Sequence, residues 1–155
     1  MDTIKAEYVS KTEFYWENQD NLQILNDQKT FIGVEQNEEN YFYDIVIEDI
    51  SDTDSNYVPI KFSSDQSYIS SILIDEDKNC MFTGCLNGIL VQYSLDIRGY
   101  SRKIIKDYGD LRIGEIISCF RFRNIAVFGG DKSSIAFIDI ENKYHIGNIL
   151  SLIHI

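Results

Sequence analysis

Short apolar stretches separated by polar turns run through the second half of the chain, and their lengths are those of β-strands. The pattern predicts strands over 69–74, 80–83, 89–95 and 103–108. These stretches are rich in Ile, Phe and Tyr, which favour strands over helices. Asn87-Gly88 lies between two of them and predicts a hairpin with a type I′ turn, in which both residues have positive φ. No convincing 3.6-residue apolar period occurs, so we expect little helix.

The same order of strands then repeats further along the chain. The pattern predicts strands over 116–122, 125–128 and 134–140, and a very short outer strand over 144–146. Residues 147–155 match residues 114–122 in type, position by position. We therefore expect the sequence to stop inside the first strand of a further unit.

This repetition has a fixed period. Gly84 and Gly129 lie 45 residues apart, as do Tyr93 and Ile138, and the two copies align without a gap. An earlier, looser copy places Tyr43 where the second copy has Tyr93. Periods of roughly 20 to 50 residues are typical of repeat architectures built from one supersecondary unit. The positions that carry the repeat are Gly33, Tyr43, Asp44, Gly84, Asn87, Gly88, Tyr93, Gly129, Ile138 and Asp139.

These positions resemble the WD40 repeat family of β-propellers, whose blades are four-stranded antiparallel sheets. The sequence departs from the family, because it has no Trp-Asp dipeptide and no Gly-His dipeptide, and its turn aspartate is replaced by Asn87 and Lys132. The resemblance implies an all-β, WD40-like fold without the family's buried Asp-His-Ser-Trp network. We therefore expect apolar packing of Tyr43, Tyr93 and Ile138 to hold the blades together.

The resemblance also suggests how the chain is divided. The expected parts are an unassigned strand-like segment at 1–19, a partial WD40-like propeller at 20–155 with blades at 20–67, 68–114 and 115–147, and the start of another blade at 148–155. Propellers have roughly four to eight blades. We therefore expect the chain to be part of a longer protein, or an arc that another chain completes.

Charge is distributed unevenly along the sequence. The net charge is −11, and residues 1–60 alone carry 14 acidic residues against three lysines. An acidic chain gains no affinity from counterion release on a polyanion, so nucleic acid is not expected as a partner. Residues 98–123 carry seven basic residues against three acidic ones. The plainer interpretation of this stretch is a set of solvated strand and loop positions. The residues of a candidate interaction surface there are Arg98, Arg102, Lys103, Lys106, Arg121 and Arg123.

The reactive residue types form no pattern typical of a catalytic, cofactor or metal site. Cys80, Cys85 and Cys119 include no CxxC pair, and neither of the two histidines lies at ligand spacing from a cysteine. Residues 52–56 begin like a calcium loop but lack its later glycine and glutamate. We therefore expect no enzyme activity, no cofactor and no metal. Without a transmembrane segment or a signal sequence, reduced thiols favour the cytoplasm.

What remains is the function that the resemblance implies, a non-enzymatic scaffold that binds proteins or peptides through the loops and edges of a propeller. Such a segment is expected in a multi-protein assembly, for example a cytoskeletal or ciliary one. Two alternatives stay open. One is a regulatory propeller attached to an enzyme outside this chain. The other is peripheral binding of phosphoinositides or other anionic lipids through residues 98–123, where Phe and Arg alternate over 120–123 and a strand would place both arginines on one face.

Overall fold

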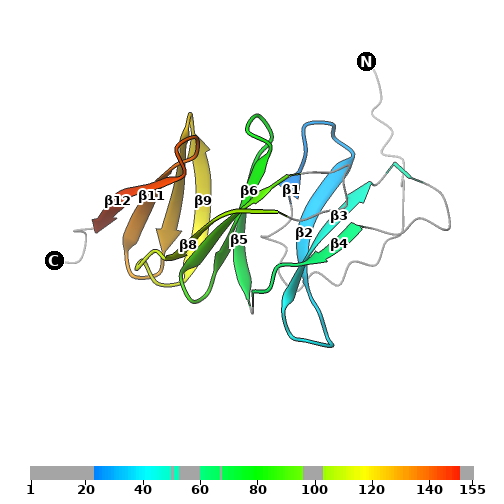
Figure 1. The fold of residues 1–155 in the computed structure, drawn as a ribbon, viewed down its shortest axis with the longest axis horizontal. Coiled ribbons are helices and arrows are strands. Elements are labelled where there is room, and N and C mark those ends of the chain that lie inside the picture. Colours follow the sequence, from blue (N-terminus) through cyan, green and yellow to red (C-terminus); the bar gives the residue numbers. More distant parts are fainter. Residues whose placement is uncertain (1–22, 50, 53–59, 67, 96–102, 151–155) are drawn as a thin grey trace, which may run out of the picture.

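The structure, a computed structural model, describes residues 23–49, 51–52, 60–66, 68–95 and 103–150. Twelve strands occur in this part of the chain and no helix, as the sequence predicts. They form three antiparallel sheets, each built from four consecutive strands. Figure 1 shows the three sheets side by side along the long axis of the molecule, with β1 to β4 at one end and β9 to β12 at the other. This is the stacked arrangement in which each unit contacts its neighbours.

The first sheet contains strands from the loosest copy of the repeat. Its strands are β1 (Gln23–Ile24), β2 (Thr30–Gln36), β3 (Tyr43–Asp49) and β4 (Ile60–Ser63). Residues 37–42 join β2 to β3, and the Asn37 side chain supports this turn by accepting a hydrogen bond from Glu39 N at 2.9 Å. The edge strand β4 pairs with β3 and completes this sheet.

The second sheet contains the strands that the sequence predicts most clearly. They are β5 (Ile69–Asp75), β6 (Cys80–Cys85), β7 (Ile89–Ser94) and β8 (Ile104–Asp110). The hairpin at Asn87-Gly88 is present, but the prediction of a type I′ turn is wrong. Of these two residues Gly88 alone has positive φ, at 82°, and its N–H donates to the carbonyl of Cys85 at 3.0 Å. The loop therefore has three residues, with glycine in the left-handed position that follows a type I turn.

The third sheet consists of β9 (Ile116–Phe122), β10 (Ile125–Gly130), β11 (Ser134–Asp139) and β12 (Tyr144–Leu150). Its outer strand is longer than the expected 144–146. Residues 148–150 pair with Ala136, Ile135 and Ser134, so they complete this sheet instead of beginning another. A register shift next to Gly147, between Phe137 and Ile138 on the partner strand, lets the strand continue past that glycine. From sequence, Gly147 looked like the start of a new unit.

Two layers of apolar side chains hold the three sheets together. One lies between the first and second sheets and includes Ile32, Ile45 and Tyr93, and the other lies between the second and third sheets. In the second layer the rings of Phe82 and Phe128 lie 5.6 Å apart at 58°. Such a pair adds about 0.5–1.5 kcal/mol to the free energy of burial. The second sheet is thus covered on both faces, and every residue of β6 is buried.

Candidate functional site

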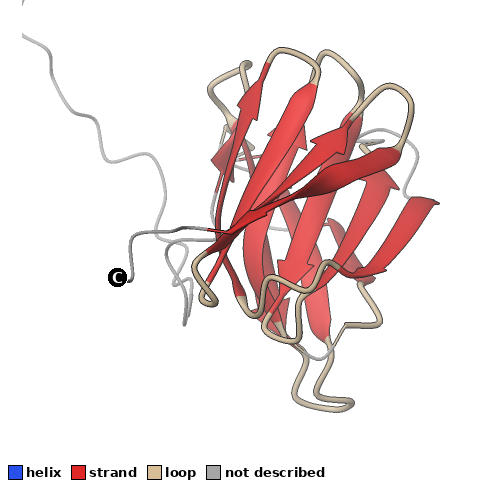
Figure 2. Cartoon of the chain, turned by 90° about the vertical axis from the view of Figure 1, so that its left-hand side faces the viewer, coloured by secondary structure: helices blue, strands red, loops and turns tan. Residues whose placement is uncertain are grey.

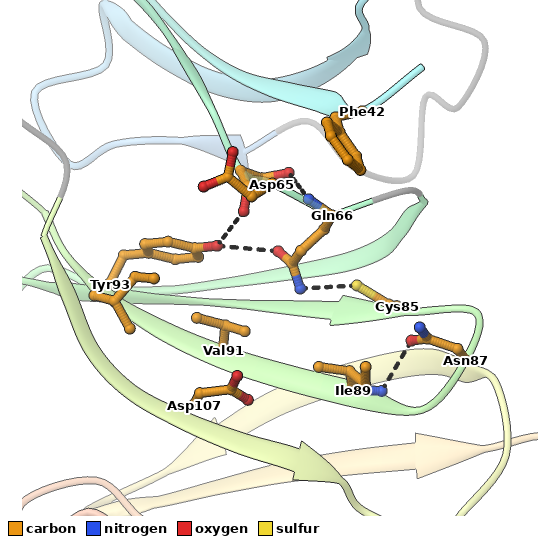
Figure 3. Close-up of a pocket in the computed structure, with 11 residues that line it drawn as sticks. Phe42, Asp65, Gln66, Cys85, Asn87, Ile89, Val91, Tyr93 and Asp107 are labelled. Atoms are coloured by element: carbon orange, nitrogen blue, oxygen red, sulfur yellow. Dashed lines mark hydrogen bonds between the residues drawn. The ribbon is translucent and has the colours of Figure 1, made fainter. Parts of the chain in front are cut away.

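A pocket of about 280 Å³ opens between the first and second sheets (Figure 3). Its walls come from the β2–β3 turn, the connection between β4 and β5, the β6–β7 turn and the first half of β8. Ile89 and Val91 of β7 contribute apolar wall, while Gln66 and Cys85 contribute polar groups. The pocket therefore combines an apolar lining with a few convergent polar atoms, which is the usual composition of a binding site.

Gln66 organises the polar side of the pocket. Its side chain is buried, and its Oε1 accepts hydrogen bonds from Thr83 Oγ1 at 2.6 Å and from Tyr93 OH at 3.1 Å. Its Nε2 donates to Cys85 Sγ at 2.9 Å. The single hydroxyl hydrogen of Tyr93 is shared between Gln66 Oε1 and the carbonyl of Ser64, which lies 3.0 Å from the hydroxyl oxygen. The four side chains thus form a buried network in which the polar atoms satisfy one another, as buried polar groups require.

The main chain holds this network in place from the first sheet. Tyr43 N donates to the carbonyl of Gln66 at 2.8 Å, and Ser64 N donates to the carbonyl of Tyr43 at 2.9 Å. Ser64 Oγ accepts from Gln66 N at 3.0 Å. The connection between β4 and β5 is therefore fixed to the beginning of β3, so the pocket wall does not depend on a free loop.

The rim of the pocket is acidic and partly aromatic. Asp65 and Asp107 are both exposed at the opening, and Asp107 Oδ1 accepts a hydrogen bond from Gly109 N at 2.8 Å. Phe42 and Ile104 are 39% and 45% exposed beside them. Two carboxylates above an apolar wall produce a negative potential at the opening, which favours a cationic group.

The cysteine in the pocket is a poor nucleophile. Burial raises the pKa of Cys85 to about 12, and the negative charge of Asp107 adds to the effect. Burial also raises the pKa values of the Cys80 and Cys119 thiols. Because the thiolate is the reactive form, none of these free cysteines is activated at neutral pH.

The described residues hold no cluster of metal-binding side chains. No group of three His, Cys, Asp or Glu side chains in this part of the chain is arranged to hold a metal ion. His145 contacts Asn148 at 2.7 Å between Nε2 and Oδ1. The calcium-like segment begins at Asp52, and the rest of it lies outside the described residues, as does His154. The described part of the chain contains no helix, and so none that could cross a membrane.

Comparisons with known proteins address the fold. No family model and no curated protein sequence matches the chain. Among solved structures, the WD40 domain of Toxoplasma gondii coronin is similar, with a TM-score of 0.64 at 12% sequence identity. The fold is that of WD40 propeller blades. The similarity covers 79% of this chain and 33% of the coronin chain, so the protein spans about a third of the length of that neighbour.

Apolar packing joins the three WD40-like blades as expected, because Tyr43 and Tyr93 belong to one buried cluster and Ile138 to the other, but one junction also contains buried hydrogen bonds. Tyr93 and Ile138 are the fifth residues of β7 and β11, and both are fully buried. Around Tyr93 the junction contains the network of Gln66 and Thr83 described above. At the next junction, Ile113, Phe128 and Ile138 take the corresponding places and belong to one apolar cluster. A Tyr-Gln-Thr network therefore serves one junction, although the family's own residues are missing.

Not all of the repeat positions coincide in the WD40-like fold. Gly84 and Gly129 pair with Leu90 and Ile135, the second residues of β7 and β11. The first blade differs, because Tyr43 begins β3 opposite Gln36 and so does not correspond to Tyr93 near the end of β7. The reason is the longer β2–β3 turn. Matching residues 43–45 to residues 93–95 by type alone does not reveal the difference in turn length. The remaining repeat positions are Gly33 in the middle of β2, Asp44 after Tyr43, Asn87 and Gly88 in the β6–β7 turn, and Asp139 at the end of β11.

The basic residues do not gather into one surface among the described parts of the blades. Lys103 precedes β8 and Lys106 lies on it, at the outer edge of the second blade. Arg121 lies on β9, an edge strand of the third blade, where Nη1 pairs with Asp75 at 2.7 Å and Nη2 with Asp77 at 3.2 Å. Arg123 follows in the β9–β10 turn, over the ring of Phe122 at 5.3 Å. Arg98 and Arg102 lie outside the described residues. No sequence signal identified Asp75 as the partner of Arg121, or Gln66 as the partner of Thr83 and Tyr93.

Proposed function

We propose that this protein is a non-enzymatic interaction module that binds a segment of a partner protein at the pocket between its first two blades. The observation that carries the proposal is the pocket itself, a preformed apolar cavity with an acidic rim built from loops on a rigid scaffold. Binding residues are commonly found on such loops, because the strands beneath position them. The raised thiol pKa values and the dispersal of basic side chains support interaction over covalent catalysis or lipid binding.

The composition of the pocket suggests which side chain it receives. A volume of about 280 Å³ is suited to one large side chain of a peptide. The carboxylates of Asp65 and Asp107 favour a positive charge at the opening, while Val91 and Ile104 offer apolar contact to an aliphatic stem. Lys and Arg combine these two properties. We therefore propose an extended peptide segment with a basic residue as the ligand, and a cytoplasmic location in keeping with three free thiols.

Peptide binding tests this proposal directly. Fluorescently labelled peptides that differ at one central position, carrying Arg, Lys, Leu or Glu, are titrated with the full chain and followed by anisotropy. We expect saturable binding of the Arg and Lys peptides, weakened about tenfold or more by Asp65→Lys with Asp107→Lys, since tenfold corresponds to about 1.4 kcal/mol. Glu141→Lys, an exposed charge reversal on the third blade, is the matched control for Asp65→Lys and for Asp107→Lys taken singly.

Either of two results would reject the pocket as the binding site. One is the absence of saturable binding by any basic peptide. The other is an equal effect of the control and of the pocket variants, because a general loss of negative charge would then explain the weaker binding. Affinity purification of the wild-type protein and of the double variant, followed by mass spectrometry, then identifies the partners that depend on the pocket.

A further inference from the structure

The turn between β2 and β3 is longer than its counterparts in the other two sheets. It contains six residues, 37–42, whereas the β6–β7 and β10–β11 turns contain three each, 86–88 and 131–133. Because neighbouring strands run in opposite directions, all three turns lie at one end of the sheets, and Figure 2 shows the turns gathered at the two ends of the strands. In repeat proteins, an insertion confined to one repeat is commonly found in a loop of the face that binds a ligand.

The longer turn is held by its own hydrogen bonds. Asn37 N donates to the carbonyl of Phe42 at 2.8 Å, and Tyr41 N donates to the carbonyl of Asn37 at 2.9 Å. Phe42 N donates to Asn40 Oδ1 at 3.0 Å. Tyr41 has a φ of 62°, in the left-handed region that a bulky residue seldom adopts. The hydrogen bonds keep it there, so the backbone that carries Phe42 is fixed before any ligand binds.

Phe42 brings an exposed aromatic ring to the pocket. Of the two aromatic residues that line the pocket, Tyr93 is fully buried and Phe42 is 39% exposed. Figure 3 shows the Phe42 ring and Asp65 on the side of the first sheet, and Asp107 on the opposite side. Tyr41 is 71% exposed in the same turn but does not line the pocket. One opening is thus bordered by an aromatic ring and by two carboxylates on facing walls.

The next junction shows that the packing of the sheets does not require this arrangement. Ile113 takes the place of Gln66 there, and the residues before these two, Arg112 and Asp65, have φ values of 63° and 57°. The same backbone position thus carries a guanidinium at one junction and a carboxylate at the other. The β6–β7 turn, which is the counterpart of residues 37–42 at that junction, has no aromatic residue. The aromatic ring and the carboxylate of Asp65 are therefore features of the pocket.

We infer, on the basis of the proposed function, that the β2–β3 turn makes the pocket selective for arginine over lysine in the bound segment. The guanidinium lies on the face of Phe42, and its N–H groups donate to Asp65 and Asp107. A guanidinium is planar, stacks on aromatic faces and has several N–H donors in one plane, so it can use a ring and two facing carboxylates together. The lysine ammonium is a compact, strongly hydrated point charge, which gains less from a partly exposed ring.

Peptides that differ only at one central residue, Arg, Lys or citrulline, test the selectivity in titrations of the full chain followed by fluorescence anisotropy. We expect the Arg peptide to bind about fivefold tighter than the Lys peptide. The citrulline peptide is planar but uncharged and should not bind saturably. Phe42→Leu keeps an apolar side chain but removes the ring, so it should bring the dissociation constants of the Arg and Lys peptides to within about twofold of each other. Tyr41→Leu, in the same turn and outside the pocket, is the matched control and should preserve the preference.

Four outcomes would overturn the inference. A Lys peptide that binds the wild type as tightly as the Arg peptide would do so and leave the proposed function intact, whereas the absence of binding by both peptides would reject the two together. Saturable binding of the citrulline peptide would show that charge is not recognised. An equal loss of preference in Phe42→Leu and Tyr41→Leu would show that the ring in the pocket is not responsible. Circular dichroism checks that each variant is folded, and Phe42→Met replaces Phe42→Leu if the latter does not fold.

Discussion

Replacing Gln66 by leucine tests whether the buried network stabilises the junction between the first two sheets. The change keeps approximate size but removes both hydrogen bonds to Oε1 and the one from Nε2. Thr83, which is fully buried, loses its acceptor, and an unsatisfied buried hydroxyl costs about 1–3 kcal/mol. Tyr93 keeps its bond to the carbonyl of Ser64 and therefore adds less. We expect Gln66→Leu to lower the free energy of unfolding by about 3 kcal/mol.

A double-mutant cycle makes this reasoning refutable. Thr83→Val removes the hydroxyl without changing the shape of the side chain, and we expect it alone to cost about 1 kcal/mol, because Gln66 Oε1 keeps Tyr93. In the double variant no hydroxyl is orphaned, so its cost should fall below the sum of the single costs by about 1–2 kcal/mol. Urea unfolding followed by far-ultraviolet circular dichroism measures all four proteins. Additive costs, or a Gln66→Leu cost below about 1 kcal/mol, would refute the network as a stabilising unit.

Three further predictions concern other contacts of the fold. Arg121→Ala should lower the free energy of unfolding by about 2 kcal/mol, as measured by urea titration. This cost is smaller than that of breaking a fully buried ion pair, because the arginine is partly exposed. In the Asp75→Asn background the same substitution should cost less. Gly130→Ala should cost roughly 1–3 kcal/mol, seen as a lower melting temperature, because its Cβ would lie 2.0 Å from the carbonyl oxygen of Ile113. Stability should fall as pH rises from about 8.5 toward 12, because the Cys85 thiol ionises at about 8.5 in the unfolded chain but has a pKa of about 12 in the folded protein. Cys85→Ala should make the fall of the urea midpoint with pH shallower.

The fold could be predicted from sequence because its signals are local. Strand length, aromatic content and the repeated glycines Gly84 and Gly129 are all visible within a few residues, and the 45-residue period joins them into units. Features that depend on register were predicted less well. The Asn87-Gly88 turn has one more residue than expected, and β12 continues to Leu150. In both cases a glycine was consistent with two backbone geometries, and pairing with the neighbouring strand decided between them.

The candidate site could not be predicted, because its residues come together only when two sheets stack. Gln66 lies in a polar connection between strands and resembles a solvated residue in the sequence, yet it is buried against Tyr93 and Thr83. The basic stretch shows the converse. Arg121 looked like a free surface charge, but Asp75, 46 residues away in sequence, binds it in the fold. Contacts over such distances leave no local pattern.

The contrast between the two junctions also bears on how similar repeats find their correct order. Chains made of related units are exposed to mispairing, in which one sheet stacks where another belongs. If the third sheet replaced the first against Gln66, Thr83 and Tyr93, that junction would lose the main-chain contacts of Ser64 and Tyr43 that hold its polar groups together. Each buried group left unpaired would cost about 1–3 kcal/mol. The contacts of Tyr43 and Ser64 would thus penalise a wrong sheet at this junction, a penalty that the apolar junction around Ile113 does not provide.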